Sequence, residues 1–267
     1  MADDRILAII PAYEAAHLVP DVIREAKKHL PVLVVDDGSK DDTSGAARAA
    51  GAEVLRQEPN QGKGAALKRA FHHALAQDCD AVLTLDADGQ HDPAEIPTFL
   101  AEWRRARPDL IIGARSFDEM PFVRRMSNTI GRWSLSRAVG RDIPDNQSGY
   151  RLLSRRLVES MLESGESGFE FEVDMVLLCL RRDWPMGWVP IRTIYEGKGS
   201  HISPIEHVVQ FFRMVRKARK AARGGCRGSP RHGGAAPSPR PSWPSRSRGR
   251  TSPPAGATWA RSPGPSS

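Results

Sequence analysis

Residues 83–92 read LTLDADGQHD, which places three acids, a glutamine and a histidine directly after an apolar run. Carboxylates this close repel one another, by up to about 4 kcal/mol for two unit charges roughly 4 Å apart at an effective dielectric near 20. A chain tolerates such crowding when a cation lies among the acids. We therefore interpret this segment first as a candidate site for a positive ion.

Three interpretations of the acidic segment differ in what they require. A calcium-binding EF-hand loop that began at Asp86 would need Gly at its sixth position and Glu at its twelfth, but His91 and Pro97 stand there. A solvated acidic turn without an ion is the second interpretation. The third is a D-x-D-x-Q site in which Asp86, Asp88 and Gln90 supply the oxygen ligands that Mg²⁺ or Mn²⁺ prefers. We favour the third, because such an ion commonly bridges to substrate phosphates and stabilises a departing diphosphate.

The elements expected around this segment alternate between strands and helices. Short apolar runs predict strands, and longer segments with apolar positions at helical spacing predict helices. The expected strands cover 5–10, 31–35, 53–57, 81–85, 109–115 and 189–195. The expected helices cover 17–29, a segment capped by Asp41 or Asp42 that runs through Ala50, and then 62–77, 122–140, 154–163, 173–182 and 203–220.

This alternation predicts an α/β fold with a Rossmann-like, mostly parallel sheet flanked by helices. In such sheets, ligands bind outside the carboxyl ends of the strands. Polar segments follow three of the expected strands, at 11–14, 36–39 and 86–92. We expect these segments to converge on one cleft.

Charge and composition separate the chain into two parts. The net charge is +7, but residues 221–267 hold eight Arg and no acid, which leaves 31 basic and 32 acidic residues in 1–220. The segment 221–267 consists mainly of Pro, Ser, Gly, Arg and Ala, a composition typical of disorder. We predict one folded domain at 1–220 and a disordered tail at 221–267. Because the domain is nearly neutral, we expect no nucleic acid as its partner.

The location is predicted from what the chain lacks. No run of 18 apolar residues is present, and the N-terminus carries acids where a signal peptide carries basic residues. We expect a cytoplasmic protein without a transmembrane segment. The basic amphipathic helix at 203–220 either packs on the domain or lies on the inner face of the membrane. Cys79, Cys179 and Cys226 have no metal-binding spacing and are expected to be free thiols.

Six segments in a fixed order resemble glycosyltransferase family 2: PAYEAAHL, VVDDGSKDDT, NQGKGAA, LDADGQHDP, IIGAR and NQSGYR. Within that family they are similar to the dolichyl- and polyprenyl-phosphate mannosyl- and glucosyltransferases, over about residues 5–215. The resemblance implies a GT-A fold and an inverting transfer of a hexose to polyprenyl phosphate. The implied donor is a nucleotide-sugar of the GDP-mannose or UDP-glucose type.

The resemblance also implies which residues hold the donor. The nucleoside would be bound by Pro11, Tyr13, Asp36 and Asp37, and the metal and diphosphate by Asp86, Asp88 and Gln90. Lys63 lies near the nucleotide in this comparison, although its surroundings exclude a Walker lysine, since no Gly lies five residues before Gly62. Its alternative is an ordinary surface lysine, and His91 is interpreted as a structural neighbour.

One departure from the family concerns the donor pocket. Family members commonly read P-x-Y-N-E, whereas this chain has Glu14 and Ala15 after Tyr13. The donor carboxylate is therefore missing or moved by one position. The base and the sugar of the donor consequently stay open.

The acceptor side rests on arginines. By resemblance, Arg115 and either Arg124 or Arg125 contact the acceptor phosphate, because guanidinium groups suit phosphate oxygens. Their alternative is exposed surface charge. A phosphate monoester with a second pKa near ~6 is largely dianionic at neutral pH and can attack without a strong base. The donor phosphates are ordered, in the same resemblance, by Tyr195, Ser200 and His201.

Two alternative functions stay open. The first is transfer to a hydroxyl acceptor in polysaccharide or glycolipid synthesis, which needs a general base. Asp145 is the candidate for that base, with Glu172 and Asp174 as lesser ones. The second is a non-catalytic nucleotide-binding protein whose Arg-rich tail engages nucleic acid or acidic membrane. The intact D-x-D-x-Q segment argues against it.

Overall fold

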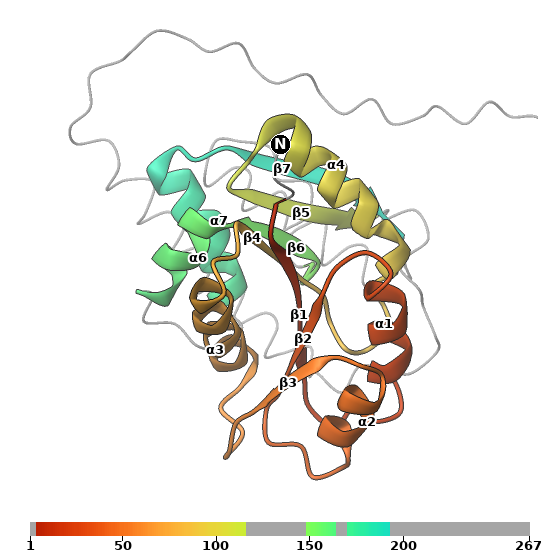
Figure 1. Cartoon of the computed structure of the whole chain (residues 1–267). Helices are drawn as coiled ribbons and strands as arrows, with labels where there is room; N and C mark the ends of the chain where they lie inside the picture. Colours follow the sequence, from red (N-terminus) through yellow and green to blue (C-terminus); the bar gives the residue numbers. More distant parts are fainter. Residues whose placement is uncertain (1–3, 116–147, 164–169, 193–267) are drawn as a thin grey trace, which may run out of the picture. The chain divides into compact units, whose positions relative to one another are not determined.

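The structure is a computed structural model that describes residues 4–115, 148–163 and 170–192. Its centre is a seven-stranded sheet (Figure 1). The strands are β1 (Ile6–Ala12), β2 (Val32–Asp36), β3 (Glu53–Arg56), β4 (Ala81–Thr84), β5 (Leu110–Arg115), β6 (Arg151–Ser154) and β7 (Met186–Ile191). The helices are α1 (Val19–Ala26), α2 (Thr43–Ala49), α3 (Lys63–Ala76), α4 (Ile96–Ala106), α6 (Arg155–Leu162) and α7 (Glu170–Arg182), with a 3-10 turn, η1, at Pro93–Glu95.

The strand order is β3-β2-β1-β4-β6-β5-β7. Strand β6 runs antiparallel to both of its neighbours, β4 and β5, and the other neighbouring pairs are parallel. The mostly parallel α/β sheet predicted from the sequence is confirmed. Because β1, β2, β4 and β5 all point the same way, their carboxyl ends lie at one edge of the sheet, and the functional segments follow those ends.

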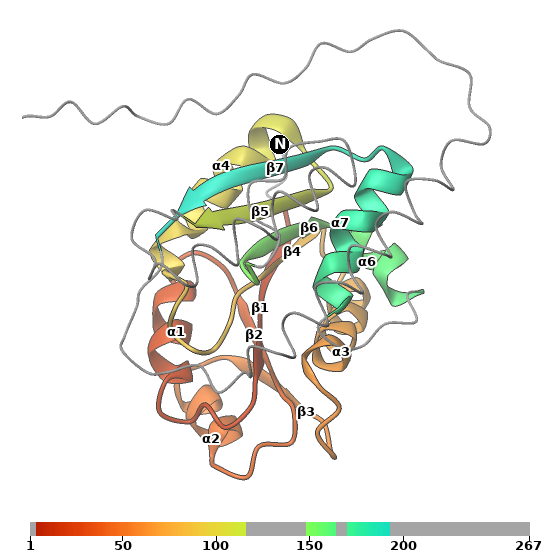
Figure 2. The same cartoon turned by 180° about the vertical axis from the view of Figure 1, so that it is seen from behind.

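Helices cover both faces of the sheet. Figures 1 and 2 show α1, α2 and α4 on one face and α3, α6 and α7 on the other. Successive strand residues point to opposite faces: Leu7 and Ile9 join the core under α3, α6 and α7, whereas Ala8 and Ile10 join the core under α1 and α4. Burial on both faces explains why these strands read as continuous apolar runs.

Local signals set several helix starts. Asp42 caps α2 by accepting a hydrogen bond from the backbone N–H of Gly45 at 3.1 Å, which confirms one of the two predicted caps. Pro20 lies in the first turn of α1, where its missing N–H costs nothing. Ser154 caps α6 through the N–H of Leu157 at 3.2 Å.

Four elements differ from the prediction. Strand β6 and helix α4 were not predicted: β6 opens on the charged Arg151, and α4 lies among the prolines of a turn-like segment. The last described strand, β7, covers Met186–Ile191 and begins three residues before the predicted start at 189, while residues 193–195 of the predicted strand lie outside the described residues. It lies at the end of the strand order, where Pro190 is tolerated. Helix α7 begins at Glu170, three residues before the predicted start.

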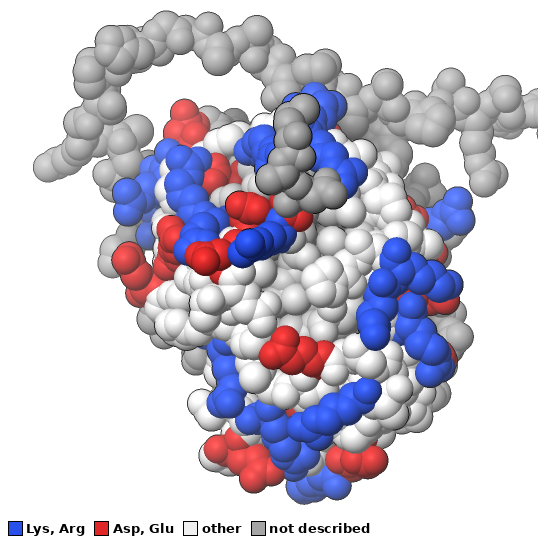
Figure 3. Space-filling model, in the orientation of Figure 1, with Lys and Arg blue, Asp and Glu red and all other residues white. Residues whose placement is uncertain are grey.

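The charged side chains of the described residues mix on the face drawn in Figure 3. Clusters of Lys and Arg lie there beside Asp and Glu, around a broad uncharged area. Exposed ion pairs such as Lys28–Glu25, at 2.7 Å, contribute little to stability. Within the three described ranges, no helix is both long and apolar enough to cross a bilayer. The predicted helices 122–140 and 203–220 and the boundary at residue 220 lie outside the described residues.

Candidate active site

The acidic turn after β4 presents Asp88 to solvent. Its Oδ1 accepts a hydrogen bond from the backbone N–H of Gln90 at 3.0 Å, and Gln90 itself is half-buried. Gly89 has a φ of 72°, a left-handed conformation that glycine adopts without strain. The side chain of Asp88 is therefore held on a tight turn at the carboxyl edge of the sheet.

Asp86 lies between a lysine and a histidine. The Nζ of Lys63 is 2.6 Å from its Oδ1. The backbone N–H of Asp86 donates to Nδ1 of His91 at 3.2 Å, so this ring nitrogen accepts and the ring proton is on Nε2. Burial works against the charged carboxylate, but the charge and hydrogen bond of Lys63, together with the charges of His91 and Arg151, outweigh burial and lower the pKa of Asp86 to about 2. Asp86 is thus ionised at neutral pH.

Lys63 also contacts an acid from a distant helix. Its Nζ is 2.7 Å from Oε1 of Glu172, in the first turn of α7. Burial alone would lower the pKa of Lys63, but Asp86 and Glu172 raise it above its ordinary value. Lys63 therefore differs from an ordinary surface lysine, because its ammonium is held between two carboxylates. Glu172, predicted as a lesser base candidate, is engaged in this ion pair.

A glycine makes room for the ion pair. A Cβ added at Gly149 would lie 2.6 Å from Oδ2 of Asp86 and 2.9 Å from Nζ of Lys63, which is too close. The carbonyl of Gly149 accepts a hydrogen bond from Oγ1 of Thr84 at 2.8 Å, which fixes it against the end of β4. The glycine of NQSGYR therefore lets Asp86 and Lys63 lie this close to the backbone, a role that sequence reasoning missed.

The two residues that follow Gly149 are buried and hold neighbouring parts of the site in place. Arg151 is fully buried; its Nε donates to the carbonyl of Ser148 at 2.8 Å, and its guanidinium also donates to the backbone carbonyl of Glu172. It thereby ties the start of α7 to β6. Tyr150, also fully buried, packs its ring 5.2 Å from that of His91. A charged Arg directly before an apolar run was the available signal for this buried support.

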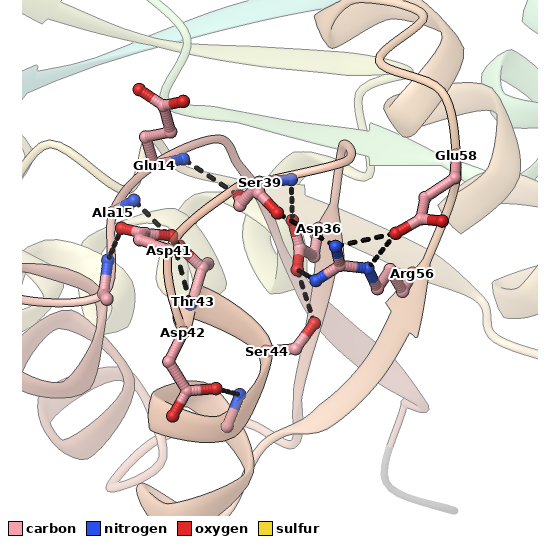
Figure 4. A network of polar contacts seen from close by, with 12 residues as sticks. Glu14, Ala15, Asp36, Ser39, Asp41, Asp42, Thr43, Ser44, Arg56 and Glu58 are labelled. Atoms are coloured by element: carbon pink, nitrogen blue, oxygen red, sulfur yellow. Dashed lines mark hydrogen bonds and ion pairs between the residues drawn. The ribbon is translucent and has the colours of Figure 1, made fainter.

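The first acid after β2 is a structural anchor. Asp36 is fully buried and accepts hydrogen bonds from the backbone N–H of Ser39 at 2.9 Å, from the hydroxyl of Ser44, and from Arg56 at 3.1 Å (Figure 4). Burial alone would raise its pKa, but the hydrogen bonds and the Arg56 charge outweigh burial and lower it. Asp36 thus holds the loop between β2 and α2. Direct contact with a nucleoside stays a prediction.

The second acid, Asp37, holds the segment that leads to Lys63. It accepts hydrogen bonds from the side-chain amide of Gln57 at 2.6 Å and from the backbone N–H groups of Gln61 and Gly62, both at 2.8 Å. It is 4% exposed. Asp37 therefore positions the start of α3, and its predicted contact with the donor is likewise untested.

The segment after β1 carries an exposed aromatic side chain. Tyr13 is 46% exposed, and its pKa is raised, chiefly by a hydrogen bond with Glu14. Pro11, half-buried, precedes it within β1. The backbone N–H of Glu14 donates to Oγ of Ser39 at 2.9 Å. Glu14 has a φ of 51°, a region that Asn tolerates better than Glu, and its carboxylate points away from the network in Figure 4.

The acceptor residues are only partly described. Arg115 ends β5 at the same edge and is half-buried. The charge of Arg115 also has a small effect on His91. Burial is the largest cause that keeps the pKa of His91 below its ordinary value. The charges of Lys63 and Arg115 act in the same direction, and the neighbouring acids act in the opposite direction. The remaining predicted site residues lie outside the described residues: Arg124, Arg125, Asp145, Tyr195, Ser200 and His201.

Other predicted residues lie inside helices or the core. Asp174 is buried in α7. Cys79 and Cys179 are buried free thiols, as predicted, and burial raises the pKa of Cys179 to about 12. Cys226 lies outside the described residues.

The oxygen atoms of the acidic turn suit a hard divalent ion that is also coordinated by water or by substrate phosphates. Among the described residues, no group of three His, Cys, Asp or Glu side chains is arranged to hold a metal alone. Asp86 and Asp88 are the carboxylates at the turn, and Gln90 follows two residues after Asp88. Mg²⁺ and similar ions are commonly held by one or two carboxylates together with water and substrate phosphates. The site therefore suits an ion that binds with a diphosphate.

Two curated relatives and one solved structure are similar to this chain. Undecaprenyl-phosphate mannosyltransferase of Micrococcus luteus is 32% identical over 210 residues, covering 73% of this chain and 86% of the relative. UDP-N-acetylglucosamine–dolichyl-phosphate N-acetylglucosaminyltransferase of Methanococcus voltae is 26% identical over 220 residues, covering 73% and 88%. The structure of Mycobacterium tuberculosis glucosyl-3-phosphoglycerate synthase with Mn²⁺, UDP and phosphoglyceric acid has a TM-score of 0.64 at 20% identity, covering 84% of this chain and 79% of that one.

These comparisons confirm the GT-A fold and the predicted family. The structural likeness shows the fold, in which neighbours have been crystallised with a divalent metal and UDP. The model of the family described as "Glycosyl transferase family 2" matches residues 7–162. This range includes the described residues predicted to bind the donor, while Glu172 on α7 lies outside it. The chain therefore belongs to glycosyl transferase family 2 and is a glycosyltransferase.

Proposed function

We propose that this enzyme moves a hexose, with inversion, from a nucleotide-sugar of the GDP-mannose or UDP-glucose type to polyprenyl phosphate, with Mg²⁺ or Mn²⁺ as cofactor. The observation that carries the proposal is the pair Asp86 and Asp88 on one turn, against Lys63, at the carboxyl edge of the sheet. The two curated relatives support the acceptor, since both are named for a polyprenyl-type phosphate. Their names differ in the sugar, so the donor is proposed only as a class.

The nucleoside would bind beside the ends of β1 and β2. The exposed ring of Tyr13 offers an apolar face for a base or ribose, and Pro11 shapes the strand end before it. Asp36 and Asp37 hold the two loops that border this place, and Asp37 also fixes the approach to Lys63. Asp36 and Asp37 would therefore contribute to donor binding at least by positioning these two loops.

The diphosphate would bind at the acidic turn. Asp86, Asp88 and Gln90 would hold the divalent ion, which when bound neutralises charge on the departing nucleoside diphosphate. Lys63 adds a positive charge at the same place. Because Gly149 has no side chain, Asp86 and Lys63 can lie close against its backbone.

The acceptor phosphate would be held by Arg115 with Arg124 or Arg125. An oxygen of the phosphate attacks the anomeric carbon from the face opposite the diphosphate; the new bond joins this oxygen to the carbon as the bond to the diphosphate breaks. Since the phosphate is already largely dianionic, no protein base is needed. Asp145 would act as a base only with a hydroxyl acceptor. The lipid acceptor would bring the enzyme to the inner face of the membrane.

Product analysis tests the proposal. Full-length protein is incubated with undecaprenyl phosphate in detergent, Mn²⁺, and GDP-mannose or UDP-glucose labelled in the sugar, and the mixture is extracted with organic solvent. Label in the organic phase that requires the lipid and is lost in Asp88→Ala supports the proposal. Label found only in a water-soluble product overturns the polyprenyl acceptor and favours a hydroxyl one.

A further inference from the structure

Lys63 occupies the position at Asp86 where a metal ion would also have to approach. Its Nζ lies 2.6 Å from Oδ1 of Asp86 and 2.7 Å from Oε1 of Glu172. The backbone at Gly149 closes one side, because a Cβ there would lie 2.9 Å from this Nζ and 2.6 Å from the other carboxylate oxygen of Asp86. The ammonium is therefore seated against Asp86 with little spare space on that side.

The charges explain why one cation excludes another. Asp86 and Glu172 carry two negative charges, and Lys63 supplies one positive charge between them. A divalent ion on Asp86 would lie beside this ammonium and be repelled by it. A diphosphate changes the balance, because its negative oxygens give both cations a partner.

The three side chains of this ion pair differ in how strongly the protein holds them: Glu172 is fixed, whereas Asp86 and Lys63 are accessible to solvent. The side chain of Glu172 is 11% exposed, and its backbone carbonyl is held by the buried Arg151. The side chains of Asp86 and Lys63 are 28% and 39% exposed. Lys63 can thus release Asp86 toward solvent while Glu172 keeps its place.

We propose that Lys63 is an internal cation that competes with the divalent ion for Asp86 and gives way only when the donor diphosphate arrives. This inference rests on the proposed function, and it adds that metal and nucleotide strengthen each other's binding. By linkage, the factor by which a nucleotide improves Mn²⁺ binding equals the factor by which Mn²⁺ improves nucleotide binding.

Mn²⁺ binding without turnover tests the inference. Free Mn²⁺ is measured by electron paramagnetic resonance with the full-length wild type, Lys63→Met and Arg69→Met, each alone and with UDP or GDP. Arg69 is exposed on the same helix, α3, so its variant matches the loss of one positive charge. We expect Lys63→Met to bind Mn²⁺ alone about tenfold more tightly than the other two proteins, the scale of coupling between contacting groups. The nucleotide should then improve its Mn²⁺ binding less.

The outcomes separate this inference from the proposed function. Mn²⁺ binding by Lys63→Met that is unchanged or weaker, in a protein with a native circular dichroism spectrum, overturns the inference even if lipid transfer is observed. The wild type gives a second measurement that needs no variant: equal Mn²⁺ affinity with and without nucleotide also overturns it. No Mn²⁺ binding by any protein under any condition overturns the metal site itself, and with it this inference.

Discussion

Replacing Gly149 by Ala should damage the site while sparing the fold. The new Cβ would lie 2.6 Å from Oδ2 of Asp86, so this oxygen must retreat by about 0.8 Å to reach an ordinary contact of 3.4 Å. Nζ of Lys63, at 2.9 Å, must move as well. The displaced atoms are the ends of flexible side chains, so we expect a change in the free energy of unfolding within about 1 kcal/mol.

The effect on catalysis should be much larger. A misplacement near 1 Å in an active site can cost about 10²-fold in rate. We therefore expect kcat/KM of Gly149→Ala to fall by about 10- to 100-fold, or roughly 1.4–2.7 kcal/mol of transition-state stabilisation. The assay is initial-rate transfer of labelled sugar into the lipid fraction, with urea unfolding measured on the same preparation.

Gly187→Ala is the matched control. This glycine lies in β7, and the nearest atom to its added Cβ is Oε1 of Glu102, at 3.3 Å. Transfer by this variant should equal that of the wild type. Wild-type kcat/KM in Gly149→Ala, or an equal loss in Gly187→Ala, would refute the role given to close approach at Asp86.

Three further predictions concern buried residues. Asp36→Asn should lower the free energy of unfolding at pH 7 by about 2–3 kcal/mol, because a charged acceptor of three hydrogen bonds is lost. The folded pKa of Asp36 lies below its unfolded value near ~3.9, so its stabilisation is complete above that value and is lost as the pH falls through the folded pKa. The difference in the free energy of unfolding between the two proteins, measured with urea, should therefore narrow below about pH 4. A difference that stays constant with pH contradicts this. Arg151→Met should cost about 3–5 kcal/mol, measured by urea unfolding, because buried carbonyls lose their donor; a loss under 1 kcal/mol would refute the anchoring role. In a Cys226→Ser background, Ellman's reagent should react with Cys79 and Cys179 only after unfolding, and rapid native reaction would show that they are accessible.

The sequence predicted the parts of the fold that depend on local pattern. Strands β1, β2 and β4 are buried on both faces, so each reads as an unbroken apolar run. Asp42 is a helix cap that composition alone indicates. Parallel pairing places the segments after these strands at one edge of the sheet, and the structure confirms this pairing.

The remaining features depend on contacts between distant residues. Nothing local to Lys63 indicates that Glu172, from α7, completes its ion pair. Asp36 has the residue type and position of a ligand, and only the fold shows that Ser44 and Arg56 saturate it. Strand β6 was missed because its first residue, Arg151, is charged, and the donors and acceptors that make its burial possible come from elsewhere in the chain.

The central claim is that the acidic turn after β4 binds a nucleotide through a divalent ion. Calorimetric titration of the full-length protein with GDP and with UDP, each with and without Mn²⁺, tests it most directly when Asp88→Ala is titrated beside the wild type. We predict that one nucleotide binds the wild type at least about tenfold more tightly with Mn²⁺, and that Asp88→Ala loses this gain. Equal affinity with and without Mn²⁺, or a gain that persists in Asp88→Ala, would contradict the claim.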